Sequence, residues 1–203
     1  MKLPKTVHTY LLVVMVASLL LLVGSSAALK SPVDTWGQAV GGLQMTLYLD
    51  PAEGVPSKAP KFRVALRNAG RNDLVVNLGM TLANGKRQYP NAVTLTLTDA
   101  QGKSRRLDLR EPAVIAGRVD PLLVPIPVGA AFSIPVNLDG YWPATSKEFD
   151  YKLKPGTYSL EARITGRSVS QQEANLDVKG IALMPYWTET VTSNRLRFEV
   201  SGQ

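Results

Sequence analysis

The sequence predicts an all-β domain built from antiparallel sheets. Three observations support this fold class. Apolar and polar residues alternate with a period of two along most of the chain, which places one face of a strand in a core and the other in water. Gly, Pro, Asn and Asp separate the alternating runs. No segment after residue 28 keeps a helical period, although 168–175 has room for one or two helical turns.

Seven runs alternate clearly enough to predict strands. The first four differ in their polar faces: Gln and Thr in the first, Arg in the second, Asn in the third and Thr in the fourth. Pro135 interrupts a later run, and because proline lacks an N–H, that strand is expected at a sheet edge. The seven runs cover residues 43–49, 62–67, 74–78, 93–98, 132–138, 158–164 and 196–200.

Turn residues lie between these runs. Asn84-Gly85 is the dipeptide that two-residue hairpin loops favour. Residues 68–73 (NAGRND) separate the second and third runs, and 99–102 (DAQG) follow the fourth. Pro155-Gly156 comes just before the sixth run. Many short strands at this spacing are typical of a sandwich or barrel.

Two connections are too long for simple turns: residues 110–130 and 167–194. Loops of more than about 12–15 residues without structure are uncommon in compact domains and are often functional. The alternative is that they contain extra strands. Leu122, Val124 and Ile126 could pair along a sheet edge, and Ala174, Leu176 and Val178 also alternate.

The first 28 residues have the pattern of a signal peptide. Lys2 and Lys5 precede the uncharged run 10–23, and the small residues 25–28 (SSAA) follow it. A charged start, an apolar run of about 7–15 residues and a small-residue site are the marks of secretion. The alternative is an uncleaved membrane anchor formed by residues 10–23. We therefore expect a secreted or periplasmic domain at 29–203, with a membrane partner only if the leader is retained.

The composition argues against several kinds of chemistry. The chain has no cysteine, and its one histidine, His8, lies in the leader. Imidazole and thiolate are the groups most used for proton transfer, nucleophilic attack and zinc binding. Removing the leader lowers the formal net charge from +7 to +5. The remaining basic residues are scattered and do not alternate with aromatic residues, so no nucleic-acid partner, metal or cofactor is expected.

Paired carboxylates are the remaining route to catalysis, as in glycoside hydrolases. No spacing singles out a pair, and most acids sit at turns, where they bind the local backbone. We therefore expect no enzyme activity, with a carboxylate-based hydrolase as the least favoured alternative. The available acids are Asp99, Asp108, Glu111, Asp120, Asp139, Glu148, Asp150 and Glu161.

Several segments resemble bacterial secreted immunoglobulin-like β-sandwich domains. These are 62–70 (FRVALRNAG), 74–79 (LVVNLG), 93–102 (VTLTLTDAQG) and 155–162 (PGTYSLEA). Their order is also similar to that of the bacterial intracellular proteinase inhibitor family. The resemblance implies an immunoglobulin-like antiparallel β-sandwich with extra strands or long loops, in which Tyr158 would pack at a sandwich corner. It carries little information about activity, because fold alone does not determine function.

Two adjacent aromatic pairs are the candidate binding residues: Tyr141-Trp142 and Tyr186-Trp187. Exposed on one surface, they would form a platform for a sugar ring or a protein partner. Buried, they would fill the open ends of the two sheets, and this second interpretation is favoured unless Trp142 and Trp187 share one surface.

The sequence therefore predicts an exported binding or structural module that recognises a protein or glycan through loops at one end of the domain. The alternative is a protease inhibitor that inserts the loop at 110–130. The ligand and the assembly state are not specified by these patterns.

Overall fold

A computed structural model describes residues 35–50, 60–111, 117–143, 153–169 and 184–201. The signal peptide predicted over residues 1–28 lies outside this set, as do Ala174, Leu176 and Val178. Within it, no helix has the length and apolar character needed to cross a membrane.

The described residues form twelve strands and one turn of 3-10 helix, η1. Every strand pair in this part of the chain is antiparallel, which confirms the predicted all-β class. The elements are β1 (Leu43–Leu49), β2 (Lys61–Asn68), β3 (Leu74–Leu82), β4 (Arg87–Tyr89), β5 (Val93–Asp99), β6 (Ser104–Leu109), β7 (Asp120–Ile126), β8 (Ala131–Asn137), η1 (Leu138–Gly140), β9 (Tyr141–Trp142), β10 (Gly156–Thr165), β11 (Thr190–Thr192) and β12 (Leu196–Val200).

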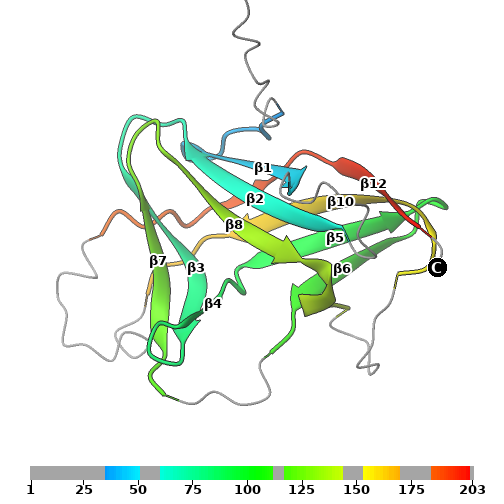
Figure 1. Cartoon of the computed structure of the whole chain (residues 1–203). Helices are drawn as coiled ribbons and strands as arrows, with labels where there is room; N and C mark the ends of the chain where they lie inside the picture. Colours follow the sequence, from blue (N-terminus) through cyan, green and yellow to red (C-terminus); the bar gives the residue numbers. More distant parts are fainter. Residues whose placement is uncertain (1–34, 51–59, 112–116, 144–152, 170–183, 202–203) are drawn as a thin grey trace, which may run out of the picture. The chain divides into compact units, whose positions relative to one another are not determined.

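The strands pair in three sheets, shown in Figure 1. The first has the order β1-β2-β8, and the second has the order β4-β3-β7. The third has the order β11-β10-β5-β6-β9, and β12 also pairs with β10. Pro135 of β8 lies on an edge strand, as its missing N–H predicts. The segment 110–130 contains β7, an extra strand on the edge beside β3, and 167–194 contains the short strand β11.

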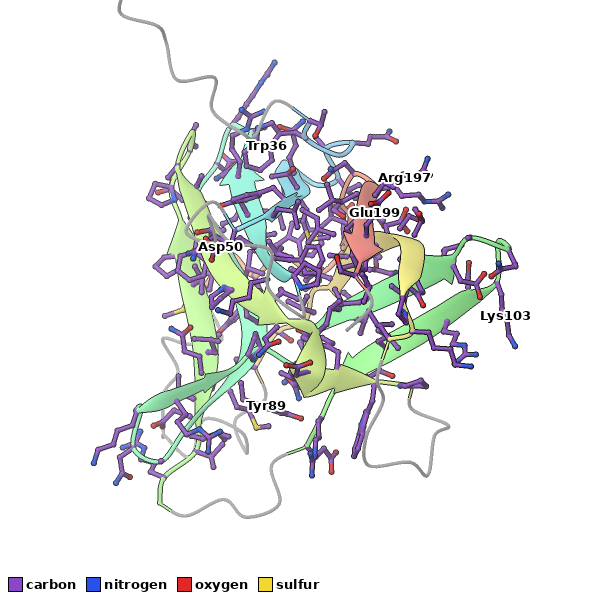
Figure 2. All side chains as sticks on the ribbon, turned by 45° about the vertical axis from the view of Figure 1, so that its right-hand side comes forward. Trp36, Asp50, Tyr89, Lys103, Arg197 and Glu199 are labelled. Carbon is purple, nitrogen blue, oxygen red and sulfur yellow. The ribbon has the colours of Figure 1, made fainter. Side chains whose placement is uncertain are left out.

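The apolar residues of the alternating runs meet in one hydrophobic core. Phe62 of β2 contacts Phe198 of β12 edge to face, with ring centroids 5.1 Å apart, so the first and third sheets face each other. Phe198 also stacks on Tyr158 at 5.8 Å. Figure 2 shows Arg197 and Glu199 of β12 pointing away from this interior. Core residues with no exposed surface include Leu43, Met45, Val64, Val76, Leu78, Val93, Leu95, Leu160 and Ile164.

Two chain segments bend together where β2 leads to β3 and β7 leads to β8, at the upper left of Figure 1. Asn68 lies at this bend and has no exposed surface. Its Nδ2 donates to the carbonyl oxygens of Asn72 (2.8 Å) and Ile126 (2.9 Å), and its Oδ1 accepts from the N–H of Gly70 (2.9 Å). One buried side chain therefore ties both bends together.

The Asn84-Gly85 turn differs from the predicted two-residue loop. Leu82 and Arg87 form the last strand pair, so the β3–β4 loop has four residues. Ala83, Asn84 and Gly85 all have positive φ, at 52°, 58° and 80°. Asn84 and Gly85 nevertheless lie at the centre of the turn, as predicted, where Lys86 N donates to the carbonyl of Ala83 (3.4 Å), and Asn84 Oδ1 also accepts from the N–H of Arg118 at 2.8 Å.

Candidate functional site

Tyr141 and Trp142 follow η1, which Asn137 caps by accepting from the N–H of Asp139 at 3.1 Å. The two residues pair with the end of β6 and therefore point to opposite sides of the strand. Tyr141 is 3% exposed. Trp142 is half-buried, and the guanidinium of Arg110 lies 4.9 Å from its ring centroid. Only Trp142 of this pair presents a ring near the surface.

Tyr186 and Trp187 lie beside β3, where Trp187 N donates to the carbonyl of Val75 (2.9 Å). Trp187 is 3% exposed, and its Nε1 donates to the carbonyl of Val40 (3.0 Å). The hydroxyl of Tyr186 is buried without a hydrogen-bond partner among the described residues, and burial raises the pKa of this side chain. Trp187 is thus an interior residue.

Of the two interpretations of these aromatic pairs, the favoured one, burial, describes Tyr141 and Trp187, and the alternative of one exposed platform does not fit the structure. Tyr141 and Trp187 are buried, so neither can offer a ring face to a ligand. The pairs are also separated, since β9 and β11 occupy opposite edges of the same sheet, and Trp187 comes just before β11. Trp142 and Tyr186 are the half-buried members of the set, and the hydroxyl of Tyr186 is itself buried.

A groove of about 640 Å³ opens beside Trp142, between the end of β6, η1, β4 and the end of β8. Tyr89 lies in it, at the opposite end of the domain from Trp36 in Figure 2. Its walls carry charges of both signs: Arg87 and Arg110 against Glu111 and Asp139. The volume is within the range of about 300–1,000 Å³ that is typical of ligand sites. The other lining residues are Leu82, Gln88, Pro90, Leu109, Pro135, Asn137, Gly140 and Tyr141.

Two tyrosines form the inner wall of this groove. Tyr89 donates its hydroxyl to the carbonyl of Leu109 at 3.3 Å. Burial raises the pKa of Tyr89, and the charge of Glu111 raises it further. Burial also raises the pKa of Tyr141 strongly, with a second contribution from Tyr89. Both hydroxyls therefore stay neutral near pH 7.

Ionisation of Tyr141 is expected to destabilise the fold at alkaline pH. Its folded pKa lies above the ordinary value of 10.0, so the neutral form stabilises the fold fully below pH 10.0, and that contribution is lost as pH rises further. Above pH 10.0, the free energy of unfolding of the wild type should fall relative to that of Tyr141→Phe by up to about 1.4 kcal/mol per pH unit. Urea unfolding from about pH 9 to about pH 11 measures it; parallel curves would contradict this assignment.

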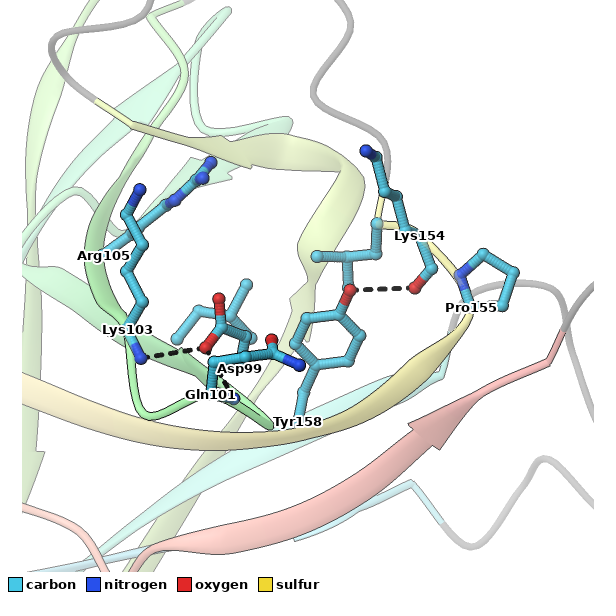
Figure 3. Close-up of a pocket in the computed structure, with 9 residues that line it drawn as sticks. Asp99, Gln101, Lys103, Arg105, Lys154, Pro155 and Tyr158 are labelled. Atoms are coloured by element: carbon cyan, nitrogen blue, oxygen red, sulfur yellow. Dashed lines mark hydrogen bonds between the residues drawn. The ribbon is translucent and has the colours of Figure 1, made fainter.

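A second pocket, of about 360 Å³, lies at the β5–β6 turn and is shown in Figure 3. Lys103 and Arg105 line one wall, and Lys154 the other. Asp99 Oδ1 accepts from the N–H groups of Gln101 (3.1 Å) and Lys103 (2.8 Å), and so holds the predicted turn. Tyr158 donates to the carbonyl of Lys154 at 2.9 Å. Asp99 and Tyr158 thus use their polar groups to hold the local backbone and not to face a ligand. This pocket is therefore a weaker candidate binding site than the groove.

No group of three or more His, Cys, Asp or Glu side chains in the described segments could hold a metal ion. No known family model and no curated protein matches this chain. One solved structure with some similarity is AvmM, described as catalysing macrocyclization in alchivemycin A biosynthesis. The match has a TM-score of 0.32 and 12% identity, and it covers 83% of this chain and 96% of that chain. At this TM-score the likeness carries no argument.

Sequence reasoning missed Tyr89, Arg87 and Arg110 as groove residues. They come from β4 and from the segment after β6, which belong to different sheets and meet where the hydroxyl of Tyr89 donates to the carbonyl of Leu109. The sequence contains one local indication of this site. Arg110 and Glu111 lie at the start of the long connection 110–130, and long connections often carry functional residues.

Proposed function

We propose that this chain is an exported, immunoglobulin-like β-sandwich module without catalytic activity, which recognises a protein or glycan through the groove beside Trp142. The observation that carries the proposal is the groove itself: an open site of about 640 Å³ lined by Tyr89, Tyr141 and two arginines, one of which, Arg110, also contacts the ring of Trp142. Trp, Tyr and Arg are the residues that contribute most to binding at protein interfaces.

Strand pairing supports the immunoglobulin-like part of the proposal. The orders β1-β2-β8 and β6-β5-β10-β12 follow the A-B-E and C′-C-F-G sheets of that fold. Tyr158, near the start of β10, donates its hydroxyl to the backbone four residues upstream, at Lys154. This bond has the form of the tyrosine corner at the start of strand F.

Export is supported by the sequence pattern of residues 1–28. Retention of residues 10–23 as an anchor is the alternative, and the mass of the protein recovered from the cell distinguishes the two. In either case the domain would meet partners outside the cytoplasm.

Trp142→Ala is expected to weaken ligand binding by about 30-fold or more, because the Trp142 ring packs against Arg110, a guanidinium that lines the groove. A glycan array and a protein panel would first identify the ligand, and calorimetry would then measure the affinity. Trp36→Ala is the matched control, since Trp36 also stacks on an arginine, Arg67, with 4.4 Å from the guanidinium carbon to the ring centroid. Equal losses in the two variants would sink the proposal.

One observation favours a second candidate, the carboxylate-based hydrolase. Glu111 and Asp139 both line the groove, and two carboxyl groups across a sugar-binding site are what glycoside hydrolysis requires. Product analysis of a bound glycan separates the candidates. A binding module leaves the glycan intact, whereas a hydrolase cleaves it and loses that activity in Glu111→Gln and Asp139→Asn.

A further inference from the structure

The outer face of the third sheet carries hydroxyl and guanidinium groups instead of apolar side chains. The threonines of β5 lie on this face because Val93, Leu95 and Leu97 point into the core. A shallow hollow of about 530 Å³ lies over β5, β6 and β10. It is lined by Asn91, Ala92, Thr94, Thr96, Arg106, Arg163, Thr165, Gly166 and Arg167.

The described residues that line this hollow include three arginines and no acid, whereas the groove beside Trp142 is lined by Glu111 and Asp139. Two acids lie on the same face beside the hollow, Asp108 of β6 and Glu161 of β10, and Glu161 lies 4.0 Å from Arg195. Arg163 makes no ion pair within the described part of the chain. Arg106 uses Nε (3.0 Å) and Nη2 (2.9 Å) on one oxygen of Asp108. Since a guanidinium has five N–H donors, Arg106 retains donors for a second anion.

Sheet register sets the spacing of the two arginines. Arg106 pairs with Thr96 across β6 and β5, and Arg163 pairs with Thr94 across β10 and β5. The two backbone positions are therefore two strands apart, about 10 Å across the sheet, with threonine hydroxyls between them. This arrangement suits a chain that carries repeated negative charges and hydroxyl groups better than it suits one small ion.

We propose that this face binds an anionic polysaccharide. Arg106 and Arg163 would contact successive carboxylate or sulfate groups, for which guanidinium is a favoured partner. Thr94, Thr96 and Thr165 would hydrogen-bond the sugar hydroxyls. Among the described residues, no aromatic ring lines the hollow, which does not favour stacking of nucleic-acid bases there. The exposed large apolar residues, Leu49, Val128 and Met184, lie outside it, so it offers no apolar surface for insertion into a lipid bilayer.

This inference goes beyond the proposed function, because it concerns a different surface. The groove lies past the end of β6, whereas the hollow lies on the outer face of β5, β6 and β10. Trp142→Ala should therefore leave polysaccharide binding unchanged, and either proposal can fail while the other stands.

The test measures binding of the purified protein to polygalacturonate and to dextran sulfate, with neutral dextran as the uncharged control. The double variant Arg106→Gln/Arg163→Gln should bind about tenfold more weakly, which corresponds to about 0.7 kcal/mol for each arginine and lies within the range of exposed ion pairs. Arg195→Gln/Arg197→Gln is the matched control, since it removes the same charge from residues that do not line the hollow. Its affinity should stay within about twofold of the wild type.

Three results would overturn the proposal. Equal losses in the two double variants would show general charge attraction without a site. Absence of binding to both anionic polymers would remove the ligand class. Binding only to vesicles of phosphatidylglycerol and phosphatidylcholine, and not to the polymers, would assign the face to a membrane instead. Selective loss in Arg106→Gln/Arg163→Gln supports it.

Discussion

Replacing Trp187 with alanine should lower the free energy of unfolding by about 3–5 kcal/mol, the range measured when a large buried aromatic is removed from a core. Trp187 is 3% exposed and belongs to the main hydrophobic cluster. Two glycines make room for it: a Cβ on Gly166 would collide with the Trp187 backbone and ring, and one on Gly41 would lie 2.9 Å from Nε1. The backbone at Gly41 and Gly166 is already packed closely around the ring and cannot easily move to fill the cavity that alanine would leave. The loss in free energy of unfolding should therefore lie toward the upper end of this range.

Two control variants separate packing from hydrogen bonding at this position. Trp187→Phe keeps much of the ring contact but removes the bond from Nε1 to the carbonyl of Val40, so it should cost about 1–3 kcal/mol. Trp36→Ala removes a half-buried ring stacked on Arg67 and should cost about 1 kcal/mol or less. Urea unfolding measures all three. A loss in Trp187→Ala no larger than that in Trp36→Ala would refute the interior role of Trp187.

The second large effect is expected from Asn68→Asp, which should lower the free energy of unfolding by about 3–5 kcal/mol at neutral pH. The two side chains have nearly the same shape, but aspartate lacks the Nδ2 donors. Its negative charge would face the carbonyl oxygens of Asn72 and Ile126, which Nδ2 of asparagine contacts at 2.8 and 2.9 Å. The position has no exposed surface, so water cannot stabilise the carboxylate.

The loss in Asn68→Asp should shrink at acid pH, because protonation removes the buried charge and restores one donor. Asn137→Asp is the matched control. There the side chain uses its oxygen to accept from the N–H of Asp139, and a carboxylate can do the same, so the change should be within about 0.5 kcal/mol. Similar losses at both positions would show that Asn68 does not tie the two bends together.

Alternation in the sequence predicted the longer strands because their inward residues carry the core. The runs at 43–49, 93–98 and 196–200 are strands in the structure, nearly residue for residue. The short strands β4, β9 and β11 have only two or three residues, too few to show a period. Their pairing depends on neighbours that are distant in the sequence, which no local pattern contains.

The role of Asn68 was also outside the reach of pattern reasoning. In sequence it belongs to a turn motif, where asparagine ordinarily bonds to its own backbone two residues on, as it does here with Gly70. Its bond to Ile126, 58 residues away, forms only because β7 pairs with β3 at the same bend.

The orientation of the aromatic pair Tyr141-Trp142 could be predicted only once its strand and its pairing partner were known. Adjacent residues of a strand point to opposite faces, so Tyr141 and Trp142 could not both lie on one surface once β9 paired with β6. The groove needs Tyr89 and Arg110 beside that strand. Arg110 reaches β9 through a backbone hydrogen bond from its N–H to the carbonyl of Gly140 (2.8 Å). Tyr89 belongs to another sheet and reaches the site through the bond from its hydroxyl to the carbonyl of Leu109 (3.3 Å).

Amide hydrogen exchange with and without a ligand found on the array would test the proposed binding site most directly. Binding should slow exchange in 87–89, 109–111 and 139–142, the segments that form the groove and the adjoining strand β9. Slower exchange confined to other parts of the chain, with these three segments unchanged, would contradict the proposed site.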